Sequence, residues 1–318
     1  MKNDASPMIA DLHCDTAMKL LKGKGLDNAA NHVSLAKLRT GRVGLQVFAC
    51  WISPKFRRQA ARQQALQMIA AVRDEVEKHP DDLMLVSDRA SWRQCREQGK
   101  IGALLAIEGG HACVDDPAYL DEYDDLGVRI LTLTWNNHNK FADSSAHALK
   151  RGSDGGLTDL GRELVRRAAT LGMVIDLSHS SQRTFWDVLE LAQGHAMVSH
   201  SCAMGLRRHH RNLTDEQIKA LAKQGGLLGI NFYPGFLGDQ RDPADIQSVV
   251  DQFAYIKKLA GTGFLTMGSD FDGISKTPQE LDGPDKFPAL LQALRQAGFT
   301  GHEIEDVSHR NVLRFLGW

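Results

Sequence analysis

The chain has 318 residues, 42% of them hydrophobic, which is enough to bury the core of one large or two ordinary domains. Its 38 basic and 39 acidic residues give a formal net charge of −1, which excludes a general electrostatic attraction to nucleic acid or to an anionic membrane. Five widely spaced cysteines without a CxxC pair exclude a disulfide framework and a zinc ribbon, and they favour a reducing compartment.

The start of the chain bears on its location. The first eight residues, MKNDASPM, include an acid and a proline and leave no room for the apolar region of a signal peptide. No apolar run approaches the length of a membrane span. The basic cluster RRHHRN, at residues 207–212, is the one local patch of positive charge. We therefore expect a cytoplasmic protein with neither a membrane nor a nucleic-acid partner.

Eight short apolar runs recur along the chain, each followed by a polar turn and most by a helical pattern. They occupy residues 8–14, 45–52, 102–109, 129–135, 173–179, 195–201, 227–233 and 264–270. Apolar stripes predict helices over residues 62–79 and 246–259, and capping boxes that begin at Thr214 and Thr300 predict two further helix starts. Such alternation is typical of parallel strands joined by crossover helices.

The number of these units indicates the fold class. Eight strand–helix units over about 270 residues match a (β/α)8 TIM-type barrel in count and length. The alternative is an open doubly wound sheet, but no GxGxxG follows the first run to indicate a dinucleotide site. No linker divides the chain, so we expect residues 1–318 to form a single domain.

Ligand-type side chains collect at the carboxyl ends of five of the eight runs. They are His13, Asp15, Glu108, His179, His200 and Asp270. In a barrel all carboxyl ends meet at one rim, which would make these residues neighbours. Three histidines and three carboxylates exceed the three protein ligands of a usual catalytic zinc, and two cations that share a carboxylate fit the count better.

Each of these residues also has an ordinary structural interpretation. His13 and Asp15 could form a surface or capping pair, and His179 and His200 could be core histidines. Glu108 could cap a turn, and Asp270 could cap a helix. The coincidence of all six favours the metal site. Within it, Asp270 could serve as ligand and as general base, moving a proton from the attacking water to the leaving amine.

Seven motifs, in this order, resemble the renal (membrane) dipeptidase family of zinc peptidases, part of the amidohydrolase superfamily. They are DLHCDT, AIEGGH, IDLSHSS, VSHSCA, HHRNLTD, INFY and GSDFDG, and the similarity runs from about residue 8 to NVLRFL near the end. The resemblance implies a (β/α)8 barrel of the metal-dependent hydrolase kind with two zinc ions per subunit. It also implies that metal-activated hydroxide hydrolyses dipeptides, often of the L-Xaa-D-Xaa type, and that the enzyme forms a homodimer.

The resemblance also implies a role for each site residue. His13 and Asp15 would bind one ion, His179 and His200 the other, Glu108 would bridge the two, and Asp270 would bind the first ion and act as base. Asp270 and Glu108 are thus the expected catalytic residues. Arg211 would bind the substrate's free carboxylate through its planar guanidinium, with Tyr233 beside it. These ligands also accept manganese, iron or cobalt, so the metal is zinc by resemblance only.

One motif departs from the family. Mammalian members have Leu-Thr-His on the fourth strand, and that histidine helps to hold the tetrahedral intermediate, whereas this chain reads LTLTW. We expect Trp135 to form a wall of the substrate pocket, and Asn136, Asn137 or His138 to supply the missing donor. Trp135 and His138 are therefore expected substrate contacts.

Two other functions stay open. One is a metal-dependent hydrolase of another bond, in a lactone, a cyclic amide or an N-acyl amino acid, which Trp135 favours. The other is a non-catalytic scaffold that keeps the barrel for its shape.

Overall fold

Parallel strands form the centre of the molecule. The computed structural model describes residues 7–192, 194–238 and 243–318. Within them the strands are β1 (Ile9–Cys14), β2 (Val43–Trp51), β3 (Leu83–Leu85), β4 (Ile101–Glu108), β5 (Val128–Thr132), β6 (Val174–Asp176), β7 (Ala196–Ser201), β8 (Leu227–Ile230) and β9 (Leu265–Met267). Residues 1–6, on which most of the prediction about a signal peptide rests, lie outside the described part.

Eight of these strands close into a barrel. The sheet order is β2-β1-β9-β8-β7-β6-β5-β4-β3, and β2 also pairs with β4, which joins the two ends. All pairings are parallel. This confirms the predicted (β/α)8 barrel, and each of the eight predicted apolar runs overlaps one barrel strand.

The remaining strand, β3, was not predicted. It pairs with residues 101–103 of β4, on the edge that β5 occupies further along. Only three residues, Leu83–Leu85, form it. So short an apolar run gives too weak a periodic signal to be distinguished from a loop.

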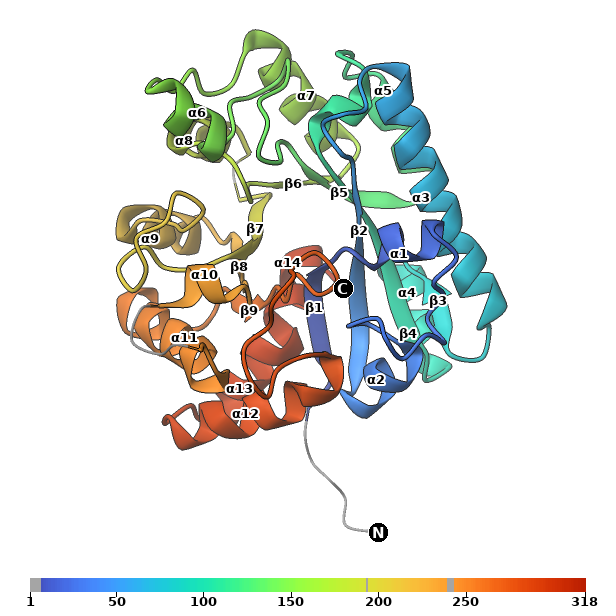
Figure 1. Ribbon diagram of the computed structural model, residues 1–318, viewed down its shortest axis with the longest axis vertical. Helices are drawn as coiled ribbons and strands as arrows, with labels where there is room; N and C mark the ends of the chain where they lie inside the picture. The colour runs from blue at the N-terminus through green and yellow to red at the C-terminus, as the bar shows by residue number, and fades with distance from the viewer. Residues whose placement is uncertain (1–6, 193, 239–242) are drawn as a thin grey trace.

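Helices surround the barrel (Figure 1). They are α1 (Thr16–Leu21), α2 (Leu35–Thr40), α3 (Gln59–Lys78), α4 (Arg89–Glu97), α5 (Tyr119–Asp125), α6 (Ser145–Arg151), α7 (Asp159–Thr170), α8 (Gln182–Ala192), α9 (Asp215–Lys223), α10 (Pro234–Leu237), α11 (Ile246–Ala260), α12 (Phe287–Gln296), α13 (Gly301–Glu305) and α14 (Asn311–Leu316). Two 3-10 turns, η1 (Gly110–Cys113) and η2 (Pro284–Lys286), and a π-helical turn, η3 (Asp306–Arg310), complete the set.

The predicted helix signals correspond to real helices. In α3 the buried side chains include Ala65, Met68, Ile69 and Val72, so one stripe of the helix faces the barrel. The capping boxes that begin at Thr214 and Thr300 open α9 and α13. Each such cap satisfies an otherwise unpaired backbone N–H and contributes about 1 kcal/mol.

An apolar cluster fills the barrel below its carboxyl rim. It includes side chains from seven barrel strands, such as Leu45, Leu104 and Met197, packed together with Val312 of α14. The five cysteines are buried and free, which fits the expectation of no disulfide framework. No helix in the described part of the chain is long and apolar enough to cross a membrane.

Candidate metal centre

The structure brings all six predicted ligand residues to one place. His13 lies in β1 and Asp15 follows it, Glu108 ends β4, His200 lies in β7, and His179 and Asp270 follow β6 and β9. Five of the six are buried, and Asp270 is partly buried. Barrel closure therefore gathers residues that are up to 257 positions apart in the sequence, from 13 to 270.

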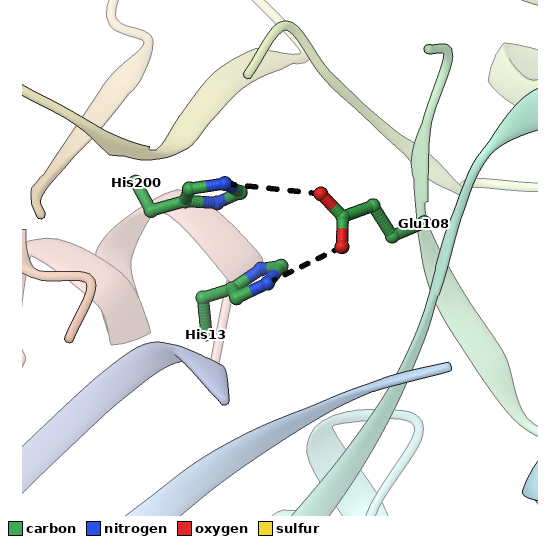
Figure 2. A group of neighbouring side chains, drawn as sticks. All are labelled: His13, Glu108 and His200. Atoms are coloured by element: carbon green, nitrogen blue, oxygen red, sulfur yellow. Dashed lines mark ion pairs between the residues drawn. The ribbon is translucent and has the colours of Figure 1, made fainter. Parts of the chain in front are cut away.

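Glu108 faces His13 with one carboxylate oxygen and His200 with the other (Figure 2). Its Oε2 lies 3.6 Å from His13 Nε2, while its Oε1 lies 3.1 Å from His179 Nε2 and 3.8 Å from His200 Nε2. The two Nε2 atoms of His179 and His200 are 3.1 Å apart. One carboxylate thus presents a different oxygen to each side of the centre.

On the first side, His13 meets the other two carboxylates. His13 Nε2 is 3.6 Å from Asp15 Oδ2. Ligand atoms of His13, Asp15 and Asp270 all lie within 4.8 Å of one another, and the same holds for His13, Glu108 and His200. These are the distances at which one small cation contacts several donors.

The backbone next to these carboxylates has no room for a side chain. A Cβ at Gly273 would collide with Asp15 Oδ2 and Asp270 Oδ1. Asn231 Nδ2 donates a hydrogen bond to Asp270 Oδ2 at 3.0 Å, and so fixes the orientation of this carboxylate. The glycine of GSDFDG is therefore part of the site.

The protonation preferences of the cluster suit a cation. Burial would lower the pKa of His13, but the neighbouring carboxylates of Asp15, Glu108 and Asp270 raise that pKa to about 10. Burial, opposed by the charge of His13, raises the pKa of Asp270 to about 7. Burial also raises the pKa of Glu108. A divalent cation replaces such protons and stabilises the deprotonated donors together.

The hydrogen bonds of the three histidines also suit a bound cation. His13 Nε2 is buried and has no hydrogen-bond partner among the described residues. Burial, with nearby positive groups, lowers the pKa values of His179 and His200, which favours the neutral imidazoles that metals bind. The residues present therefore fit a metal centre of nitrogen and carboxylate donors.

Polar partners hold the far side of each imidazole. His179 Nδ1 lies 3.0 Å from Asn136 Oδ1, and His200 Nδ1 lies 2.8 Å from Ser199 Oγ. Such hydrogen bonds orient metal-binding imidazoles. The sequence indicated Asn136 only as one candidate donor among three, and it did not indicate Ser199.

Two of the six residues adopt strained backbone conformations. His179 and Asp270 have φ angles of 66° and 61°, in the left-handed region, and Asp272 has a φ of 66°. Each such residue costs roughly 1 kcal/mol or more. The strands β6 and β9 end before them, so these side chains lie on turns over the rim.

A cavity of about 580 Å³ opens over this centre. Residues that line it include Trp51, Trp135, Arg211, Tyr233 and Phe236. The rings of Trp51 and Trp135 meet edge to face at 5.1 Å between centroids. The cavity therefore has an aromatic wall on one side and the guanidinium of Arg211 among its polar groups.

Arg211 is buried at the wall of this cavity. Its Nη2 donates to the His200 carbonyl oxygen at 3.3 Å, whereas its Nε has no partner among the described residues. Burial lowers the pKa of Arg211, and the charges of Asp270 and Glu108 oppose that shift.

Of the four predicted substrate contacts, His138 is the one that the structure does not bring to the cavity. It is exposed, and its ring lies 3.9 Å from that of His147 in α6. Asn136, two positions earlier, lines the cavity instead.

Comparison with known proteins agrees with the fold and with the family that the motifs resemble. A family model described as membrane dipeptidase (peptidase family M19) matches residues 4–317. An uncharacterized dipeptidase of Schizosaccharomyces pombe is 35% identical over 297 residues, which cover 89% of this chain and 71% of that protein.

Solved structures share the whole fold. Dipeptidase AC, a metallo peptidase of family M19, superposes with a TM-score of 0.90 at 25% identity, over 98% of each chain. A metallo peptidase from Rhodobacter sphaeroides, bound to a phosphinate mimic of L-Ala-D-Ala, has a TM-score of 0.90 at 24% identity, over 98% of this chain and 99% of that one. The chain therefore belongs to the membrane dipeptidase family, peptidase family M19, and is a metal-dependent dipeptidase.

Proposed function

We propose that this dipeptidase uses two zinc ions. The expected ligands are His13, Asp15 and Asp270 for one ion, His179 and His200 for the other, and Glu108 for both. The observation that carries the proposal is the position of Glu108, whose two oxygens face separate groups of histidines at 3.1–3.8 Å. A single ion would leave half of this donor set without a role.

The proposed chemistry divides between the ions and the chain. When bound, two such cations polarise a scissile carbonyl and lower the pKa of water. Asp270 supplies the general base, because Asn231 holds one of its oxygens and the other remains for proton transfer. It takes the proton from the attacking water and gives it to the leaving amine.

Arg211 and Tyr233 are the proposed contacts for the carboxylate of the substrate. Arg211 is a buried cation at the cavity wall with an unpartnered Nε, and a guanidinium binds a carboxylate through two parallel hydrogen bonds. A fixed anchor near the centre selects short peptides, because only their scissile bond then reaches the centre. Trp135, packed against Trp51, limits the substrate side chain that fits in the cavity.

We further propose a preference for dipeptides of the L-Xaa-D-Xaa type. The support is the resemblance of the motifs and the L-Ala-D-Ala mimic that the related Rhodobacter sphaeroides protein binds. A cytoplasmic location, a homodimer and a single domain over residues 1–318 stay predictions from the sequence.

A stereoisomer screen tests this function directly. Zinc-loaded enzyme is assayed on the L-L, L-D, D-L and D-D forms of several dipeptides, beside a panel of lactones, cyclic amides and N-acyl amino acids. The expected result is hydrolysis of dipeptides, fastest for L-D forms, and little turnover of the second panel. Faster turnover of a lactone or an N-acyl amino acid than of any dipeptide would contradict the proposed substrate class.

A further inference from the structure

A single buried hydroxyl contacts histidines on both sides of the metal centre. Ser199 Oγ lies 2.8 Å from His200 Nδ1 and 3.4 Å from His13 Nδ1. It also lies 2.7 Å from Asp176 Oδ2. Ser199 and Asp176 are buried, at 1% and 0% exposure, so water does not compete for these contacts.

Asp176 acts as a hydrogen-bond acceptor at both of its oxygens. Its Oδ1 receives the backbone N–H groups of Ser178 and Ser199 at 3.0 and 2.8 Å, and also the Ser178 hydroxyl at 2.9 Å. Its Oδ2 receives the Thr132 hydroxyl at 2.6 Å and the Ser199 hydroxyl. The hydroxyl hydrogen of Ser199 is therefore directed at Asp176.

The two acceptor lone pairs of Ser199 Oγ determine which imidazole nitrogens carry hydrogen. A serine hydroxyl has one hydrogen and two acceptor lone pairs. The Ser178 hydroxyl, 3.1 Å from Ser199 Oγ, gives its own hydrogen to Asp176 Oδ1. With the Ser199 hydrogen also given to Asp176, Ser199 Oγ accepts from His200 and His13, so both Nδ1 atoms are the protonated ones. In the neutral form of the two rings, which is the form that binds a metal, both Nε2 atoms are then bare, and these are the atoms that face Glu108.

We propose that Ser199, oriented by Asp176, is a positioning residue that holds His13 and His200 in the tautomer needed for metal binding, and so serves both ion sites at once. This inference rests on the proposed function, which places these histidines on different ions. Hydrogen bonds of this kind set ring orientation and ligand basicity in metal sites. His179 is independent of Ser199, because its Nδ1 is held by Asn136.

Zinc affinity of the demetallated full-length enzyme provides the first test. We expect Ser199→Ala to weaken the binding of both zinc ions about 10- to 100-fold in a chelator-competition titration. The matched control is Thr132→Val, which removes the other hydroxyl on Asp176 Oδ2 but contacts neither imidazole, and its affinities should stay near wild type. Circular dichroism melting of each variant confirms that it folds.

The titration distinguishes a failure of the proposed role of Ser199 from a failure of the proposed two-zinc function. Wild-type affinity of Ser199→Ala for both ions, or a loss confined to one ion, would overturn the shared role of Ser199. Failure of the wild-type enzyme to bind two ions would instead overturn the proposed function, and this inference with it.

Imidazole nitrogen resonances supply a readout that needs no variant. In zinc-loaded wild-type enzyme with 15N-labelled histidine, His13 and His200 should show protonated Nδ1 and metal-bound Nε2. Protonated Nε2, or zinc on Nδ1, at either histidine would contradict the inference.

Asp176→Asn tests the direction of the network. The amide oxygen of the new asparagine would take the place of Oδ1 and accept the three hydrogen bonds made there. The NH2 group would then take the place of Oδ2 and donate to Ser199 Oγ. The serine hydrogen would have to turn toward an imidazole. We expect zinc binding to weaken about 10- to 100-fold, and wild-type affinity in this folded variant would refute the role of Asp176.

Discussion

At the scale of single residues, Glu108 determines how the centre is divided. Its two oxygens face His13 on one side and His179 and His200 on the other. No other described carboxylate contacts histidines in both groups. Asp270 lies on the same side as His13, and Asn231 holds one of its two oxygens. We therefore propose the same carboxylate as metal ligand and as proton carrier.

Asp270→Asn separates binding from proton transfer. The asparagine keeps the shape and can still accept the hydrogen bond from Asn231, but it cannot take a proton. We expect kcat to fall about 10²- to 10⁴-fold. Metal content, measured by atomic absorption on the same sample, should remain near wild type. A variant with wild-type kcat would remove Asp270 from the proposed mechanism.

Arg211→Ala tests the carboxylate anchor. Loss of a charged hydrogen-bonding group should raise KM for dipeptides about tenfold or more, with metal content unchanged. The matched control is Arg208→Ala, three positions earlier in the same loop, where the side chain is exposed. Steady-state kinetics on several dipeptides measure both variants, and equal KM values for Arg211→Ala and wild type would rule the anchor out.

At the scale of elements, the sequence predicted the existence of the strands more accurately than the residues at which they end. The apolar run 173–179 yields only Val174–Asp176 as strand, because the left-handed backbone at His179 cannot continue β6. Residues two positions apart on a strand, such as His13 and Asp15, would face the same way. In fact β1 ends at Cys14 and Asp15 is already the N-cap residue of α1, so a turn rather than the pleat brings Asp15 to the site.

Irregular pairing between β7 and β8 explains why the sequence did not indicate Ser199 as a site residue. The register of β7 against β8 shifts between Val198 and Ser201. Strict alternation would turn Ser199 and His200 to opposite faces, yet both contact the centre. A bulge of this kind leaves no simple mark in the sequence.

The loop after β9 is fastened by Asp272. Its carboxylate accepts hydrogen bonds from Thr16 Oγ1 and from the backbone N–H groups of His32 and Val33, at 2.8–3.2 Å. The loop that carries Asp270 is thereby tied to α1 and to the segment before α2.

Asp272→Ala should destabilise this part of the rim. Its loss leaves buried donors without acceptors, and we expect the free energy of unfolding to fall by about 3 kcal/mol. Urea denaturation at a fixed zinc concentration measures the effect. Asp282→Ala, an exposed change in the same loop, should stay within about 0.5 kcal/mol of wild type. Equal stability of the two variants would contradict the fastening role.

At the scale of the whole molecule, barrel closure converts scattered motifs into one site. The ligand-type residues could be found from the sequence because parallel strands send their carboxyl ends to one rim. Trp51 could not be found in this way, because it reaches the cavity through a ring contact with Trp135 that has no periodic pattern in the sequence. His138 was expected at the cavity and lies outside it.

The most direct measurement is the anomalous scattering of zinc in crystals of the zinc-loaded protein. Two peaks should appear, one beside His13, Asp15 and Asp270 and the other beside His179 and His200, with the Glu108 carboxylate between them. A single peak, or two peaks of which Glu108 contacts only one, would contradict the account.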